Sequence, residues 1–277
     1  MHATCNRQRQ TRQQVKGIKR SSINAIIAAA TLAAAAPASA AEITLTATFR
    51  DFLDSHADFE QDIGGSDHDI VADTLGPDRK PVYAPGASGS TLTTNGKTEF
   101  DQWYRDVPGV NMTTTKPLIL LETATPGTFS FTTGAFYPID DELFGNQGRT
   151  HNYHFTTEIH GEFTYGGGEI FGFTGDDDVF AFINGIKVID IGGIHGAIGI
   201  SISLDAKASE LGLVLGETYE FDFFHAERQT IASAFTFTTS IDLEDTPLST
   251  SVSEPATGIL FAGGLLGSAW LRRRIWR

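Results

Sequence analysis

Three consecutive aspartates, Asp176–Asp178, begin a segment whose residue types suit a hard metal ion. Asp190 follows further along the chain, beside a glycine-rich loop that carries His195. Between these acids, Asn184-Gly185 separates two apolar runs and predicts a hairpin with a type I′ turn, because both central residues of that turn need a positive φ. The hairpin would bring the four carboxylates together at the end away from its turn.

The same turn predicts the register of the hairpin. The expected pairs are Ile183 with Ile186, Ala181 with Val188, Phe180 with Ile189, and Val179 with Asp190. Because both faces of these strands are apolar, we expect a buried central hairpin.

Four carboxylates at one end of a hairpin repel each other, and removing them from water is unfavourable without a cation. The only cysteine is Cys5, so the body of the chain offers oxygen rather than thiolate ligands, which favours calcium before magnesium. The expected metal ligands are Asp176, Asp177, Asp178 and Asp190. His195 is an expected ligand-binding residue beside them. The alternative is a solvated acidic turn whose side chains cap main-chain N–H groups.

Alternating apolar and polar residues predict that the body is built from half-buried strands. The expected strands are Ile43–Phe49, Phe129–Thr132, Tyr153–Tyr165, Glu169–Thr174, Ile198–Leu204, Thr218–Phe224 and Phe235–Leu243. Two short helices are expected, one capped by Asp51 and running to Phe59, the other over Glu99–Val107. The predicted fold class is all-β, a barrel or sandwich with short helices.

The body is strongly acidic. Between residues 41 and 253 there are 10 basic and 33 acidic side chains. A surface of this charge, without a basic stripe, argues against nucleic acid or anionic lipid as the main partner.

The first 40 residues read as a secretory signal. A basic stretch ends at Lys19-Arg20, an apolar run extends over Ile23–Ala36, and Ala38 and Ala40 provide the small residues that signal peptidase accepts. The predicted domain therefore covers residues 41–243 and is exported.

The carboxyl end has the order of a membrane-anchoring tail. A polar linker over residues 244–253 leads to the residues Ser253, Glu254 and Pro255. A single apolar span follows at 256–271, and then Arg272, Arg273 and Arg274, which should stay cytoplasmic. A helix over the span would reach about 24 Å, somewhat less than a hydrocarbon core of about 30 Å. We expect a single C-terminal membrane helix.

Residues 254–277 resemble the PEP-CTERM sorting signal of Gram-negative bacteria, with Ser253 where the usual box has proline. The resemblance implies recognition and processing by an exosortase, a membrane enzyme linked to exopolysaccharide production. The alternative is a permanent C-terminal anchor.

The body resembles the bacterial fibro-slime domain, a relative of the β domain of anthrax protective antigen. The motifs that carry the resemblance are Phe49-Arg50-Asp51-Phe52, Trp103–Asn111, His151–Glu158, Gly175–Gly185, Asp190–His195 and Phe223–Arg228. It implies a protective-antigen-type β-sandwich or barrel of the kind found in adhesins, matrix proteins and carbohydrate-active enzymes. In lectin members an Asp-Asp pair joined by a cis peptide holds calcium, and the aligned pair here is Asp176 and Asp177.

Other residue patterns give weaker indications. Glu158 and His160 fall on one face of an expected strand and could share a zinc ion, but a polar strand face is the preferred interpretation. For His225, Glu227 and Arg228 we expect a structural network. No nucleophile-elbow, phosphate-loop or zinc-protease motif occurs.

Three hypotheses follow. The first is a non-enzymatic surface or matrix protein with a calcium-supported β domain, exported, held at the inner membrane and then released to the cell surface or matrix. The second is a calcium-dependent lectin that binds exopolysaccharide, and the third is a carbohydrate-active enzyme.

Overall fold

The computed structural model describes residues 41–62, 64–86 and 89–248 of the chain. The longer strands are β1 (Glu42–Phe52), β3 (Asn111–Glu122), β4 (Phe129–Thr133), β5 (Phe155–Thr164), β6 (Ile170–Gly175), β7 (Asp178–Ile183), β8 (Ile186–Ile191), β10 (Ile198–Ser203), β11 (Thr218–Glu227) and β12 (Phe235–Thr239). The short elements are β2 (Gly65–Ser66), β9 (Gly193–Ile194), β13 (Glu244–Asp245), α1 (Lys97–Phe100) and α2 (Leu204–Leu211). The all-β prediction is confirmed.

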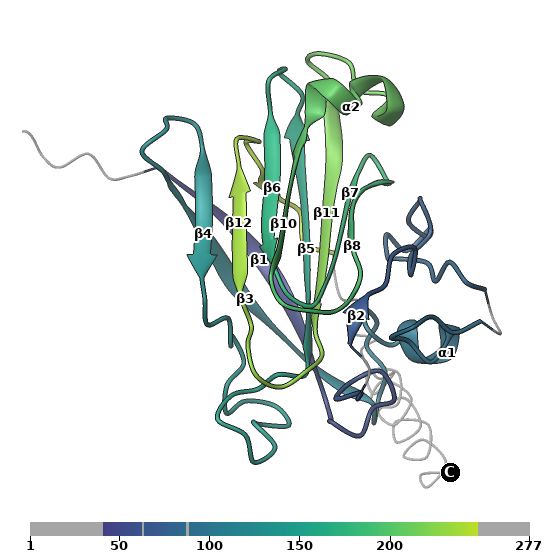
Figure 1. The fold of residues 1–277 in the computed structure, drawn as a ribbon. Helices are drawn as coiled ribbons and strands as arrows, with labels where there is room; N and C mark the ends of the chain where they lie inside the picture. Colours follow the sequence, from purple (N-terminus) through teal and green to yellow (C-terminus); the bar gives the residue numbers. More distant parts are fainter. Residues whose placement is uncertain (1–40, 63, 87–88, 249–277) are drawn as a thin grey trace, which may run out of the picture. The chain divides into compact units, whose positions relative to one another are not determined.

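The strands form one 11-stranded antiparallel sheet in the order β10-β6-β12-β4-β3-β1-β5-β11-β7-β8, with β13 added beside β5 (Figure 1). The sheet curls, so that its edge strands β10 and β8 approach each other. Its inward-facing side chains make one core, rich in phenylalanine from β5, β6, β11 and β12. Helix α2 lies at one end of this core and buries Leu204 and Leu211.

A second hydrophobic cluster covers the other face of β7 and β11. The segment between β1 and β3, which includes β2 and α1, lies beside β8 (Figure 1). Its Phe100, Trp103 and Tyr104 pack in one cluster with Phe180 and Phe224. This explains why β7 is apolar on both faces and completely buried. Its partner β8, however, is an edge strand and is only partly buried. The prediction of a buried central hairpin is therefore correct for β7 and wrong for β8.

The predicted register of the hairpin is correct only next to its turn. Ile183 pairs with Ile186 as expected, but Ala181 pairs with Ile189 and Phe180 with Asp190. The reason is a β-bulge at Ala181/Phe182, which adds one residue to β8 and shifts all later pairs by one position.

Both predicted helices are wrong, and one strand was not predicted. Asp51 does not cap a helix, because β1 continues through Phe52 and pairs with β3 along its whole length. The helix expected over Glu99–Val107 is only the short α1, followed by turns. Strand β3 was not predicted, since its first half, Asn111–Lys116, lacks apolar alternation.

The predicted linker begins inside the sheet. Glu244 and Asp245 form β13 and pair with Glu162 and Gly161 of β5. Asp245 also accepts hydrogen bonds from the main chain and hydroxyl of Thr46, at 2.8 and 2.6 Å. The domain therefore extends beyond its predicted end at residue 243.

The predictions for the two ends of the chain lie outside the described residues. These are the signal with Ala38 and Ala40, the box with Ser253, Glu254 and Pro255, the span 256–271, and Arg272, Arg273 and Arg274. Within the described part of the chain, no helix has the length and apolar character needed to cross a bilayer.

Candidate functional site

Asp176 and Asp177 lie together where β6 passes into β7, and the peptide bond between them is cis. Asp176 Oδ1 accepts a hydrogen bond from the main-chain N–H of Ala234 at 2.6 Å. Asp177 accepts one from the N–H of His195 at 3.0 Å and another from the N–H of Arg228 at 3.1 Å. Both carboxylates are buried, with 5% and 4% of each residue exposed. Main-chain donors from two separate loops thus hold the pair in place.

Glu227, at the end of β11, is a third buried carboxylate beside this pair. Burial first, and then the negative charges of Asp177 and Asp176, raise the pKa of Glu227 well above its ordinary value. Burial also raises the pKa of Asp176, and it raises that of Asp177 to about 7. Glu227 Oε2 and His195 Nε2 are buried and have no hydrogen-bond partner within the described residues. The cluster therefore holds acidic oxygens that are costly to ionise without an added cation.

Asp176, Asp177 and His195 line a hollow with a volume of about 270 Å³, which we call the aspartate mouth. Its other walls are Ile194, Gly196, Gln229, Thr230, Ile231 and Ala232. Gly193, on the same loop, can approach β2 because glycine has no Cβ. A Cβ at this position would lie 2.1 Å from a main-chain oxygen of β2 and would clash with it. The pairing of β9 with β2 thereby places His195 beside Asp177.

Asp178 does not line the mouth. Its Oδ2 accepts a hydrogen bond from Nε of Arg228 at 2.6 Å, and both side chains are fully buried. Arg228 also donates to the main-chain oxygens of Asp58 and Thr93 and lies 4.6 Å from the centre of the Trp103 ring. Asp178 thus balances a buried arginine, which is the structural network expected for Arg228.

Asp190 also lies away from the mouth. Its Oδ2 binds Nζ of Lys187 at 2.8 Å and accepts a bond from the N–H of Asp69 at 3.2 Å. The β-bulge in the hairpin is the reason, because it pairs Asp190 with Phe180 instead of Val179. Of the four predicted carboxylates, the structure brings only Asp176 and Asp177 together at the mouth.

Within the described residues, no group of three or more His, Cys, Asp or Glu side chains is placed to hold a metal ion by itself. Calcium takes 6–8 oxygen ligands and accepts main-chain carbonyls, water and ligand hydroxyls among them. Asp176 and Asp177 offer carboxylate oxygens, and Glu227 Oε2, which has no partner in the part of the chain that the structure describes, lies near them. These oxygens fit such a mixed site.

Glu227 was missed as a member of this site by sequence analysis. The signal that could have found it is the pairing of β11 with β7, in which Ala226 lies opposite Asp178. This register places the end of β11, and with it Glu227, next to the start of the hairpin.

The pair considered for zinc forms a hydrogen-bonded network instead. His160 lies between two carboxylates, with Nε2 bonded to Glu158 and Nδ1 to Asp222 at 2.5 Å. Both ring nitrogens of His160 are therefore hydrogen-bonded to carboxylates, and neither is free to bind a zinc ion. His154 belongs to a separate contact, with Nε2 at 2.9 Å from Glu60.

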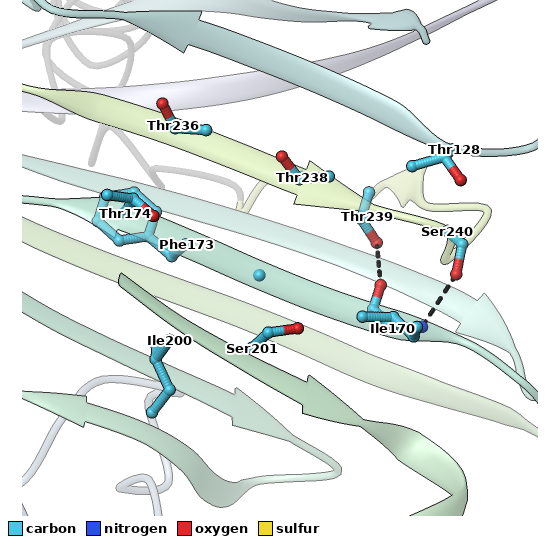
Figure 2. A pocket seen from close by; sticks show the side chains of 11 residues that line it. Thr128, Ile170, Phe173, Thr174, Ile200, Ser201, Thr236, Thr238, Thr239 and Ser240 are labelled. Carbon is cyan, nitrogen blue, oxygen red and sulfur yellow. Dashed lines mark hydrogen bonds between the residues drawn. The ribbon is translucent and has the colours of Figure 1, made fainter. Parts of the chain in front are cut away.

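A further hollow of about 300 Å³ lies over β6, β10 and β12 (Figure 2). Hydroxyls of Thr236, Thr238 and Ser201 surround it, and Ser240 accepts a hydrogen bond from the main-chain N–H of Ile170 at 2.9 Å. Its lining residues include no acid, base or histidine, so it offers contacts but no proton transfer.

Part of the chain is similar to known proteins. Residues 132–254, which include the aspartate mouth, match the PA14 domain family. Protein psiR of Dictyostelium discoideum is 38% identical over 191 residues, covering 64% of this chain and 19% of psiR. Protein psiD of the same organism is 36% identical over 214 residues, covering 72% of this chain and 42% of psiD. The chain thus spans about a fifth of psiR and less than half of psiD.

Solved structures give weaker similarity. The PA14 domain of the MpAFP antifreeze protein is 11% identical, covers 45% of this chain and 79% of that domain, and has a TM-score of 0.28. A structure described as a PA14 sugar-binding domain from an RTX adhesin is 11% identical, covers 40% of this chain and 68% of that one, and has a TM-score of 0.24.

Proposed function

We propose that this protein is an exported, non-enzymatic surface or matrix protein whose β domain binds calcium at the aspartate mouth and, through calcium, the hydroxyls of an exopolysaccharide. The observation that carries the proposal is the cluster of Asp176, Asp177 and Glu227. Their carboxylates are buried, and their pKa values are all raised. A divalent cation would stabilise the ionised forms of these groups.

The residues that would hold calcium are Asp176 and Asp177. Main-chain N–H groups already fix their orientation, so ion binding would not have to order them. Calcium would supply a charge on which sugar hydroxyls can bind at the open side of the hollow. His195, with Nε2 unpartnered within the described residues, would add a hydrogen bond to such a sugar.

The match of residues 132–254 to the PA14 domain family agrees with this proposal, because the match includes every residue of the mouth. It also agrees with the resemblance to calcium-dependent lectins that the Asp176-Asp177 pair suggested.

Export and anchoring rest on the sequence of the two ends. We propose that signal peptidase cuts after Ala40, and that an exosortase then processes the tail that begins at the Glu254-Pro255 box. Mass spectrometry of the protein from its native cells checks the second step. We expect that no peptide containing Trp276 is detected, because the tail has been removed. Detection of Trp276 would mean that the tail is a permanent anchor.

Sugar binding is tested with the purified full-length protein and neutral oligosaccharides, free of uronate, from the exopolysaccharide of its native cells. Binding should occur in 1 mM calcium and disappear with a chelator. Asp177→Asn should abolish it, because the neutral amide loses the charge that attracts the ion. The matched control is Asp242→Asn, the same change at an exposed residue, which should bind like the wild type. Binding that persists in the presence of the chelator contradicts the proposal.

A further inference from the structure

A second polar pocket lies on another part of the domain and shares no residue with the aspartate mouth. It has a volume of about 330 Å³ and is formed by β1, β5 and the segments around residues 78–80 and 104–106. Its lining consists of Thr48, Arg50, Asp78, Lys80, Tyr104, Arg105, Asp106, Glu158, His160 and Leu248. We call it the Arg50 pocket. Three of the motifs that carry the fibro-slime resemblance contribute to it, and the calcium proposal uses none of those residues.

The inner part of this pocket gathers basic side chains around a buried carboxylate. Glu158 accepts a hydrogen bond from Arg50 Nη1 at 2.6 Å and also binds Lys80 and His160. Burial opposes ionisation of Glu158, but its bond from His160 and the charges of Arg50 and Lys80 hold its pKa at about 2. Arg50, Lys80 and His160 therefore surround Glu158, and His160 also bonds a second buried carboxylate, that of Asp222.

This gathering of cations is unusual for such an acidic protein. Of the 10 basic residues between positions 41 and 253, Arg50, Lys80 and Arg105 line the pocket. Arg79 lies directly behind it, at 2.5 Å from Asp222, the second carboxylate that binds His160. Basic side chains are therefore more concentrated here than in the body as a whole, although each of them is paired with a carboxylate.

The pocket also contains hydrogen-bond donors that the described residues leave unused. The hydroxyl of Tyr104 is fully buried, lines the pocket and has no partner within the described residues. Within the described residues, Arg50 and Arg105 each donate hydrogen bonds through Nε and Nη1. The Nη2 group of each arginine therefore remains available as a donor to a ligand. A buried hydroxyl without a partner is costly, so a ligand that accepts its hydrogen bond would stabilise it.

The outer part of the pocket has a different character. Asp78 and Asp106 are half exposed, and each is held by an arginine: Asp78 by Arg105 at 3.0 Å and Asp106 by Arg50 at 2.8 Å. Carboxylates fixed in this way accept hydrogen bonds from sugar hydroxyls. A suitable ligand thus carries one anionic group for the inner part and several hydroxyls for the outer part.

We propose that the Arg50 pocket binds a carboxylated sugar unit, a hexuronate, without calcium. Its carboxylate accepts hydrogen bonds from Tyr104 and Arg50, and its hydroxyls bind Asp78 and Asp106. The volume of the pocket lies at the lower end of the range for ligand sites and suits one sugar unit. A network that served stability alone would have no need for the Tyr104 hydroxyl, which is unpartnered among the residues that the structure describes.

Isothermal titration of the full-length protein with glucuronate, in the presence of chelator, tests the proposal. Glucuronate should bind, and glucose, which lacks the carboxylate, should bind at least tenfold more weakly. Tyr104→Phe keeps the buried ring and removes only the hydroxyl that has no partner within the described residues, so its melting temperature should equal or exceed that of the wild type. Its affinity for glucuronate should fall about tenfold, the effect of one hydrogen bond to a charged group.

Two further variants locate the site. Arg105→Gln, a change at a partly exposed side chain, should also weaken glucuronate binding about tenfold. Asp242→Asn, a change at an exposed residue outside the pocket, should bind glucuronate like the wild type. Equal affinity for glucose and glucuronate, wild-type affinity in Tyr104→Phe and Arg105→Gln, or absence of binding at 10 mM each overturns the proposal. None of these outcomes bears on calcium binding at the mouth, because no calcium is present.

Discussion

The pH dependence of stability should reveal whether the aspartate mouth needs a cation. Burial raises the pKa of Asp177 from 3.8 to about 7. The folded protein therefore holds a proton on Asp177 more tightly than the unfolded chain, and stability falls as pH rises through this range. The cost of ionising Asp177 is absent below about pH 4, grows towards pH 7 and is complete above it.

Between pH 5 and pH 8 this cost amounts to about 3 kcal/mol, at 1.4 kcal/mol per pKa unit. For a domain of this size the melting temperature should fall by about 6–12 °C as a result. Asp177→Asn carries no ionisable group at this position, so its melting temperature should lack this part of the fall. The comparison is made in chelator by calorimetry at several pH values.

Calcium should remove most of this pH dependence in the wild type. At a dissociation constant of about 10 μM, 1 mM calcium stabilises the folded state by about 2.7 kcal/mol, close to the cost of ionisation. Parallel pH profiles for wild type and Asp177→Asn in chelator, together with no effect of calcium on either, would refute the reasoning.

Two further predictions concern the elements that support the mouth. Arg228→Met leaves Asp178 buried without its cation, so the free energy of unfolding in urea should fall by about 3–5 kcal/mol. Lys207→Met, at an exposed ion pair, should change it by less than about 1 kcal/mol, and equal effects would contradict the assignment. Gly193→Ala places a Cβ 2.1 Å from a main-chain oxygen of β2 and should cost about 4 kcal/mol. Gly216→Ala, also at positive φ but with no neighbour within 4 Å, should cost only about 1–2 kcal/mol.

The sequence predicted the strands whose side chains alternate clearly. Phe171 and Phe173 in β6 and Phe235 and Phe237 in β12 point into the core as their spacing requires. β3 escaped prediction because Thr113–Thr115 form a polar run, and only pairing with β1 makes that run a strand. Such pairing depends on residues far away in the sequence, which periodicity alone does not contain.

The part of the candidate site that depends on local residue patterns was predictable, and the part that depends on strand pairing was not. The turn at Asn184-Gly185 correctly closed the hairpin and placed Asp176 and Asp177 at its far end. The β-bulge that moves Asp190 away from the mouth left no signal in the local pattern. The role of Asp178 could not be predicted either. Its partner Arg228 directly follows β11, and only the pairing of β11 with β7 brings Arg228 close to Asp178.

The most direct test of calcium binding is a crystal structure of the protein grown with millimolar calcium, with anomalous diffraction used to locate the ion. If the aspartate mouth binds calcium, the map should show a calcium peak at about 2.3–2.6 Å from carboxylate oxygens of Asp176 and Asp177. An aspartate mouth that contains only water under these conditions, with calcium at other acidic surface residues, would contradict it.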